Sequence, residues 1–299
     1  MSAVIAIKRA APLTTIQDEG RFGMLRHGIS AAGPMDRSAF AHAGWLAGGG
    51  RGGVEFTAAG LELQITDGRC RIGLAGGQFV ARHNEQVVGW PATIELEAGD
   101  RLLITPGSDG NYGYVRFDQD IVAQPVLGSI ATSMRAHLGG LDGRALRAGD
   151  VIALEPSSQA QPPSPVPSVA TGPIGVTWGI HADLFSPVVR QRFTEAAFTI
   201  TPRLDRMGVQ LSDPQNVFAG AARLSLVSDA IVHGDIQILG DGTPIVLMRD
   251  HQPTGGYARI ATVISAHLDR FCQLRPGSAV TFQPVTVEHA QDLLRSQPG

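Results

Sequence analysis

The segment from Met248 to Ser265, MRDHQPTGGYARIATVIS, places a group of polar residues and two glycines between two apolar runs. Asp250 and His251 are residue types that serve in acid–base catalysis, and they also bind polar substrates through hydrogen bonds. Gly255 and Gly256 let the backbone come close to another molecule and can direct N–H groups toward an anion. The alternative is a long hairpin in which the glycines satisfy geometry and the polar side chains face water. The local sequence leaves both interpretations open.

A second polar segment, residues 14–36, carries several glycines and little hydrophobic periodicity. Its polar side chains include Gln17, Asp18, Arg21 and Asp36, and it leads into a predicted helix. Loops of this kind often build a pocket, although an extended loop that covers a sheet explains the pattern equally well. Our working hypothesis is that this segment and the one around residue 250 line a common cleft.

A third candidate is Arg206, which follows Asp205 and precedes a glycine in PRLDRMGVQLS, residues 202–212. An arginine can hold a substrate carboxylate through two hydrogen bonds, but a surface ion pair with Asp205 is the more common explanation of such neighbours. The histidines show no spacing typical of metal ligands, so no metal site is expected. The stretch PGSDG, residues 106–110, is not the nucleophile elbow of a serine hydrolase.

The basic residues exclude several classes of enzyme, because Lys8 is the only lysine and the net charge is −3. The glycine cluster GGGRGG, residues 48–53, lacks the lysine of a phosphate-binding loop. No lysine is placed to carry biotin, and Schiff-base chemistry would depend on Lys8 within a predicted strand. The negative net charge gives no attraction to nucleic acid or to an anionic membrane.

The two cysteines, Cys70 and Cys272, lie far apart and have no metal-ligand neighbours. We interpret them as buried thiols of a protein in a reducing compartment. The N-terminus does not resemble a signal peptide, and no apolar run is long enough to span a membrane. These features predict a cytoplasmic protein.

The 37 glycines, 19 prolines and many short alternating runs predict a mainly β chain. The turn signal LGDGTP, residues 239–244, predicts a hairpin. Helices are expected over residues 33–49, 181–194 and 286–296, with Pro187 disturbing the second and Val287, Ala290 and Leu294 facing inward in the third. The predicted strands are residues 61–66, 92–99, 101–106, 150–156, 222–228 and 243–248.

One short pattern occurs three times, as LEAGDRLLI (96–104), LRAGDVIAL (146–154) and LRPGSAVTF (274–282). In each copy a glycine supplies the turn, and the alternation that follows predicts a strand buried on one face. The irregular spacing favours related barrel or sandwich units over a solenoid. A stretch rich in Pro, Ser and Gln predicts an exposed connector at 156–173 between an N-terminal lobe, 1–155, and a C-terminal lobe, 174–299.

The glycine-rich segments, in this order, resemble the allophanate hydrolase subunit 2 family, also known as the C subunit of 5-oxoprolinase, which is similar to the carboxyltransferase domain of urea carboxylase. The resemblance covers nearly the whole chain and is most specific in its last block. It implies two cyclophilin-like β-barrel lobes with a few short helices. The matching stretches are TTIQDEGRFG (14–23), GPMDRSAF (33–40), VLGSIATS with GGLDGRALRAGD (within 126–150), LDRMGVQL (204–211) and the block at 234–277.

The resemblance also implies a set of site residues. Asp250 is the candidate catalytic group, near the Gly255–Gly256 backbone, and Arg206 is a candidate for binding a substrate carboxylate. The family's Gln-Thr-Thr-Gly-Gly-Tyr appears here with Pro253 at its second position, which removes one backbone donor. The other implied substrate-binding residues are Gln252, Thr254, Gly255, Gly256, Tyr257, Gln17, Asp18, Arg21, Met35 and Asp36.

What the resemblance implies about activity is a subunit of an ATP-dependent 5-oxoprolinase. Its partners would be an allophanate hydrolase subunit 1-type subunit and a third subunit, with no covalently bound cofactor and with ATP used by the complex. One alternative is a carboxyltransferase that takes a carboxyl group from carboxybiotin on a separate carrier to urea or a related amide. Another is a non-catalytic partner of a subunit of the kinase-inhibitor type.

Overall fold

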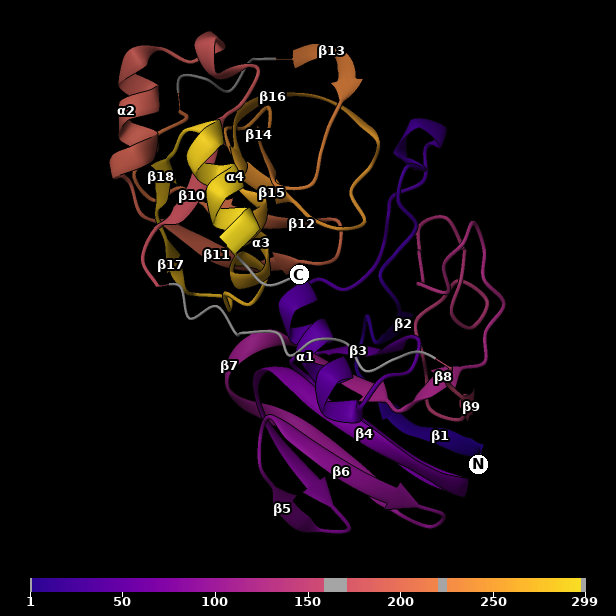
Figure 1. Ribbon diagram of the computed structural model, residues 1–299. Helices are drawn as coiled ribbons and strands as arrows, with labels where there is room; N and C mark the ends of the chain where they lie inside the picture. The colour runs from indigo at the N-terminus through magenta and orange to yellow at the C-terminus, as the bar shows by residue number, and fades with distance from the viewer. Residues whose placement is uncertain (1, 159–170, 220–224, 297–299) are drawn as a thin grey trace. The chain divides into compact units, whose positions relative to one another are not determined.

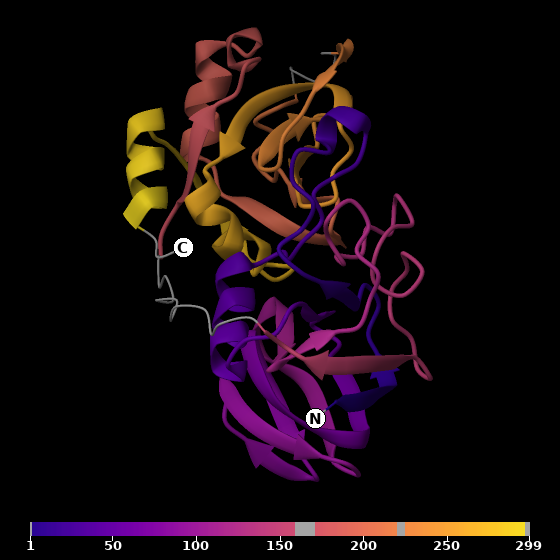
Figure 2. The same ribbon diagram turned by 45° about the vertical axis from the view of Figure 1, so that its right-hand side comes forward.

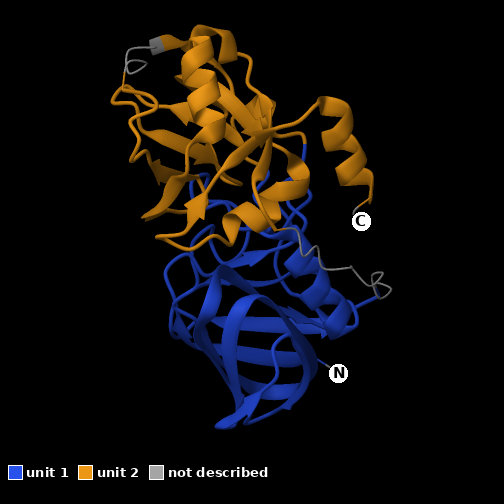
Figure 3. Ribbon diagram, turned by 90° about the vertical axis from the view of Figure 1, so that its left-hand side faces the viewer, with its two compact units in different colours: residues 1–22, 31–167 blue, residues 23–30, 168–299 orange. Residues whose placement is uncertain are grey.

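The structure is a computed structural model that describes residues 2–158, 171–219 and 225–296. The chain forms two compact units, shown in Figure 3: unit 1 comprises residues 1–22 and 31–167, and unit 2 comprises residues 23–30 and 168–299. Each unit is built on one curled, barrel-like sheet with few helices, which confirms the predicted mainly β fold. Most of the predicted connector, residues 159–170, lies outside the described residues.

Unit 1 contains a nine-stranded antiparallel sheet, with strand order β2-β3-β7-β4-β1-β9-β8 and with β5 and β6 paired to β4 (Figure 1). Inward side chains such as Ile5, Leu63 and Ile104 alternate with exposed ones and form the core. The strands are β1 Ala3–Ala10, β2 Thr15–Gln17, β3 Gly53–Thr57, β4 Leu61–His83, β5 Gln86–Val88, β6 Ala92–Glu97, β7 Arg101–Phe117, β8 Gln119–Ile121 and β9 Val151–Pro156.

Two strands of unit 1 are far longer than predicted. The expected runs at 61–66 and 101–106 are only the first parts of β4 and β7, which continue for 23 and 17 residues. Both strands pass through polar and glycine-rich stretches, where the pairing shifts register near Gly76 and Gln78. These irregularities bend the strands without ending them, so turn-forming composition is a poor guide to the strand ends here.

Helix α1, Arg37–Ala47, begins later than predicted because the Asp36 side chain caps it by accepting a 2.8 Å hydrogen bond from the Ala39 amide. Its buried face consists of Phe40, Ala43, Gly44 and Ala47, so the expected inward positions Ala39 and Leu46 were wrong. The helix packs closely on β4, since a Cβ on Gly73 would lie 2.0 Å from the Ala43 carbonyl oxygen. The position of Asp36 is therefore fixed by both a cap and a tightly packed helix.

Unit 2 contains the second nine-stranded sheet, with order β17-β11-β12-β15-β14-β16-β10-β18 and with β13 paired to β16. The predicted hairpin at 239–244 is confirmed, because β14 and β15 pair across it and the Leu239 amide donates to the Thr243 carbonyl. Residues 222–224 of one predicted strand lie outside the described residues. The strands are β10 Ile174–Trp178, β11 Phe198–Leu204, β12 Gly208–Ser212, β13 Ser225–Ala230, β14 Asp235–Ile238, β15 Pro244–Leu247, β16 Thr254–Val263, β17 Ala279–Val280 and β18 Phe282–Pro284.

The helices of unit 2 differ from the prediction in three ways. Pro187 does not disturb α2, Pro187–Glu195, because it occupies the first turn, where a proline fits, after the cap residue Ser186. Helix α3, Ser265–Cys272, was not predicted. The predicted inward face of α4, Val287–Ser296, was wrong, since Val287 is 55% exposed and Leu294 42% exposed. Figure 2 shows α4 on the outside of unit 2, beside β10. Two short 3-10 turns, η1 Leu25–His27 and η2 Ala182–Leu184, complete the described helices.

The threefold pattern of the sequence forms the same turn each time. Gly99, Gly149 and Gly277 all have positive φ, at 101°, 93° and 90°. The amide of each glycine donates a 2.8 Å hydrogen bond to an isoleucine carbonyl of a neighbouring strand: Ile65, Ile7 and Ile200. The same isoleucine donates its amide to the carbonyl of the residue after the glycine. The pattern therefore encodes a turn that is joined by two backbone hydrogen bonds to a strand in each of the units.

Candidate functional site

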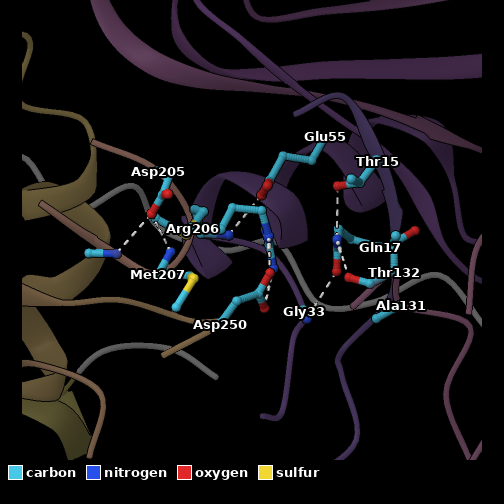
Figure 4. Close-up of polar contacts among 12 residues, drawn as sticks. Thr15, Gln17, Gly33, Glu55, Ala131, Thr132, Asp205, Arg206, Met207 and Asp250 are labelled. Carbon is cyan, nitrogen blue, oxygen red and sulfur yellow. Dashed lines mark hydrogen bonds and ion pairs between the residues drawn. The ribbon is translucent and has the colours of Figure 1, made fainter. Parts of the chain in front are cut away.

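In unit 1 the side chain of Gln17 is completely buried and fully hydrogen bonded (Figure 4). Its Nε2 donates to Thr15 Oγ1 at 2.8 Å and to the Thr132 carbonyl oxygen at 3.2 Å. Its Oε1 accepts from the Gly33 amide at 2.9 Å. The amide group thus uses its polar atoms to hold three segments of unit 1 together, which is a positioning role.

Asp18 and Arg21 tie the N-terminal segment to residues 126–131. Asp18 accepts from the Ser129 hydroxyl at 2.5 Å and from the Ile130 amide at 2.7 Å. Arg21 is buried and donates to the carbonyl oxygens of Val126 and Ala131. The structure thus joins two segments that the resemblance had marked separately, through hydrogen bonds within unit 1.

Met35 and Asp36 lie in a buried network around Glu55, a residue that the sequence analysis did not select. The Met35 amide donates to Glu55 Oε2 at 2.7 Å, and the Tyr114 hydroxyl donates to the same oxygen at 2.9 Å. The Tyr114 oxygen in turn accepts from the Asp36 amide at 2.8 Å. Glu55 is completely buried on β3. A single polar residue in a strand gives no sequence signal of such a network.

In unit 2 Asp250 and Arg206 form a buried ion pair, with Arg206 1% and Asp250 3% exposed (Figure 4). Arg206 Nε lies 2.8 Å from Asp250 Oδ2, and Nη2 lies 3.2 Å from Oδ1, so the pair is bidentate. The Asp250 amide also donates to the Arg206 carbonyl oxygen at 2.7 Å. The interpretation of Arg206 as a surface partner of Asp205 is therefore wrong, and the Asp205 carboxylate accepts from the Met207 and Gly208 amides.

The residues after Asp250 leave the interior of unit 2 step by step. His251 is buried, and its Nδ1–H donates to the Gln252 carbonyl oxygen at 2.6 Å. Gln252 is half-buried, whereas Thr254 and Tyr257 are exposed at the start of β16. The reading of this segment as a hairpin with only water-facing polar groups is therefore wrong for Asp250 and His251.

Gly255 and Gly256 allow close packing within unit 2 and do not form a left-handed turn. A Cβ on Gly255 would lie 2.6 Å from the side-chain nitrogen of Gln237, and one on Gly256 would lie 2.9 Å from the Leu226 carbonyl oxygen. The strand that carries both glycines pairs with β13, where Gly255 lies opposite Asp229. Gln237 was not selected from the sequence, although it lies in the most specific of the matching blocks.

A second buried charge cluster lies on β14 and β16 of unit 2. Arg259 Nη2 donates to Asp229 at 2.7 Å, and Nη1 lies 3.3 Å from Asp235. The Arg259 amide donates to His181 Nδ1 at 3.3 Å. Burial lowers the pKa of His181, and the positive charge of Arg259 lowers it further. Neutral His181 is thereby kept as a hydrogen-bond acceptor.

Cys70 and Cys272 are free and buried, as predicted. Burial raises the pKa of the Cys70 thiol to about 12, which makes it a poor nucleophile. Within the described parts of the chain, no group of three or more His, Cys, Asp or Glu side chains is arranged to hold a metal ion. No helix among the described residues combines the length and the apolar character needed to cross a membrane.

These features of fold and site agree with the comparisons to known proteins. The chain belongs to the carboxyltransferase domain family, subdomains A and B, which matches residues 27–284. The C subunit of 5-oxoprolinase from Haemophilus influenzae is 30% identical, over 94% of this chain and 91% of that protein. The protein of the same name from Escherichia coli is also 30% identical, over 96% of this chain and 93% of that protein.

Solved structures give the same family. The crystal structure of the urea amidolyase of K. lactis matches with a TM-score of 0.87 and 29% identity, over 99% of this chain and 19% of that chain. The urea carboxylase structure of Kluyveromyces lactis has the same TM-score, 0.87, and this chain spans 28% of it. The resemblance drawn from the sequence motifs is thus confirmed. The predicted common cleft and the substrate roles of individual residues stay predictions.

Proposed function

We propose that this chain is one subunit of a heteromeric enzyme that uses ATP to open 5-oxoproline, or a closely related lactam, to a glutamate-type product. The observation that supports this best is the agreement in length. This chain spans 91% and 93% of the two bacterial 5-oxoprolinase relatives, but only 17% of the urea amidolyase of Lachancea kluyveri. A chain of the same extent as a subunit is expected to act as a subunit.

A lactam needs activation because amide resonance stabilises its carbonyl group. Transfer of the terminal phosphoryl group of ATP to the amide oxygen turns that oxygen into a leaving group, after which water can displace it and the ring can open. In this proposal the partner subunits share the chemistry. This chain contributes part of the substrate pocket with fixed hydrogen-bonding groups, which act most strongly when they are oriented before the reaction.

Asp250 is the group that we assign to the reacting amide. Its carboxylate is held at two points by Arg206, so its remaining lone pairs have a fixed direction and can accept the N–H of a lactam. Because Arg206 is engaged with Asp250, we assign it to positioning this carboxylate and no longer to binding the substrate carboxylate. The hypothesis thus keeps the predicted pair but changes the role of one member.

The partners in this proposal are an allophanate hydrolase subunit 1-type chain and a third 5-oxoprolinase subunit. The test is to purify the chain together with these two subunits and to measure glutamate released from 5-oxoproline with ATP. We expect a stable complex in which omission of any one chain abolishes glutamate release. A complex that forms but never turns over 5-oxoproline would favour the non-catalytic alternative.

Carboxyl transfer from carboxybiotin is the second candidate, and the family match together with the urea carboxylase structure supports it. The biotin would have to be attached to a lysine outside this sequence, because Lys8, its only lysine, lies on β1 within the sheet of unit 1. Avidin distinguishes the candidates, since it blocks a biotin carrier. Activity that avidin abolishes would favour carboxyl transfer, whereas avidin-resistant glutamate release favours the 5-oxoprolinase.

A further inference from the structure

The side chain of Gln237, on β14, is 2% exposed, and its amide nitrogen Nε2 has no hydrogen-bond partner among the described residues. A primary amide offers two N–H donors and a carbonyl acceptor, and buried amides normally use them. Leaving such donors without partners destabilises the folded state, because their hydrogen bonds with water are lost on folding. A buried amide of this kind requires an explanation.

The polar neighbours of Gln237 do not supply the missing partners of its Nε2. Asp235 lies on the same face of β14, but its carboxylate already accepts from Thr262, Val232 and Arg259. Arg259, the register partner of Gln237 on β16, directs both of its Nη atoms to other acceptors. Gln237 therefore lies within a buried polar layer whose other hydrogen bonds are made without its amide nitrogen.

The amide of Gln237 lies against the glycine pair that follows Asp250. A Cβ at position 255 would come within 2.6 Å of Gln237 Nε2, and the next nearest atoms belong to Ile231. Glycine at 255 is what leaves space for the amide, since the backbone there is not in a left-handed conformation. The motif selected from the sequence and the unsatisfied amide nitrogen thus form one structural feature of unit 2.

We propose that Gln237 recognises the substrate and that the substrate class is an amide whose N–H and C=O groups lie on the same side, as in a lactam or a urea. Such a group forms two parallel hydrogen bonds with a primary amide: Gln237 Nε2–H donates to the carbonyl oxygen, and Gln237 Oε1 accepts the N–H. Linear secondary amides are trans and direct the two groups in opposite directions, so they cannot form this pair. The inference rests on the proposed function and narrows it to cis amides.

The first test compares stability with activity in Gln237→Met, which keeps the side-chain length but removes the polar atoms. Because the amide nitrogen makes no internal hydrogen bond, the variant chain should unfold about 2–4 °C higher than the wild type. In the assembled complex the KM for 5-oxoproline should rise at least about tenfold. Gln17→Met, which breaks three hydrogen bonds, should lower the unfolding temperature, and the exposed Gln283→Met should change neither property.

The second test measures ligand binding without turnover, by the thermal shift of the assembled complex. The lactam 2-pyrrolidinone and urea should stabilise the wild type, N-methylacetamide should not, and Gln237→Met should remove the response. Selective binding in a complex that does not hydrolyse 5-oxoproline would leave this inference standing while the proposed function fails. Normal turnover with an unchanged KM in Gln237→Met, or a lower unfolding temperature, would overturn the inference and leave the proposed function intact.

Discussion

The buried pair of Arg206 and Asp250 is the residue-scale feature on which the proposed chemistry depends. A buried charge is tolerated when it is paired and hydrogen bonded, and here the pairing is bidentate. Removal of one partner leaves the other charge uncompensated in the interior. Stability and catalysis are therefore coupled at this site and have to be separated by experiment.

We predict that Asp250→Asn lowers turnover at least about 100-fold, the range for loss of a positioned catalytic group, and destabilises the chain by about 3–5 kcal/mol. Urea unfolding and glutamate release measure the two effects. The double variant Asp250→Leu, Arg206→Met removes both charges and should recover most of the stability but none of the activity. Asp292→Asn, at an exposed pair on α4, is the matched control. Recovery of activity in the double variant would show that Asp250 has only a structural role.

A second residue-scale prediction concerns Cys70, whose pKa is raised by burial from 9.0 to about 12. Because the folded state holds the thiol proton more tightly, this contribution to stability is complete below pH 9 and is lost as the pH rises toward 12. The stability advantage of the wild type over Cys70→Ala should shrink by roughly 2 kcal/mol between about pH 8 and about pH 10.5. Unfolding curves at both pH values measure it, and a constant difference would refute the shifted pKa.

The sequence identified individual site residues better than their roles. Asp250, Arg206 and Gln17 stand out as polar groups beside glycines, but their partners are remote in the sequence and cannot be seen in a local pattern. Arg206 and Asp250 are 44 positions apart, and Gln17 and Thr132 are 115 apart. Gln237 and Glu55 were missed because a polar residue inside a strand is normally read as facing solvent.

At the scale of elements, the threefold turn is the clearest link between sequence and structure. Gly99 and Gly149 in unit 1 and Gly277 in unit 2 make the same two backbone hydrogen bonds to a strand. In each case the backbone is left-handed, a conformation that glycine adopts without strain. The turn fixes where the next strand begins, so it sets the register of the sheet edge that it joins.

We predict that Gly149→Ala destabilises the chain by about 1–2 kcal/mol, the cost of a left-handed non-glycine residue. The effect is one of backbone conformation alone, because a Cβ at this position meets no atom within 4 Å. Gly240→Ala is the matched control, since it is equally open but lacks a positive φ, and it should change stability by less than about 0.5 kcal/mol. Thermal unfolding of both variants is the measurement, and equal stabilities would contradict the assigned role of the turn.

The sequence predicted most strands but misjudged several element ends and faces. Alternation located the starts of β4 and β7, whereas their continuation through glycine-rich stretches depends on pairing with each other. Helix α3 was missed because its eight residues follow directly on β16 and no side chain caps it. The outward apolar side chains of α4 were misassigned because periodicity shows that a helix is amphipathic but not which face is covered.

At the scale of the whole molecule, the fold and family were correctly predicted from motif order along the chain. Two barrel-like lobes and the carboxyltransferase domain match both follow that expectation. The boundaries at 155 and 174 stay a prediction, since residues 159–170 lie outside the described residues. The relatives of this chain carry names of different enzymes, so fold alone does not determine the reaction.

The most direct test of the proposed function is glutamate release from 5-oxoproline by the three purified subunits, measured with ATP, without ATP and without this chain. The proposal predicts release that requires both ATP and this chain and is unaffected by avidin. Release at the same rate when this chain is left out would contradict it.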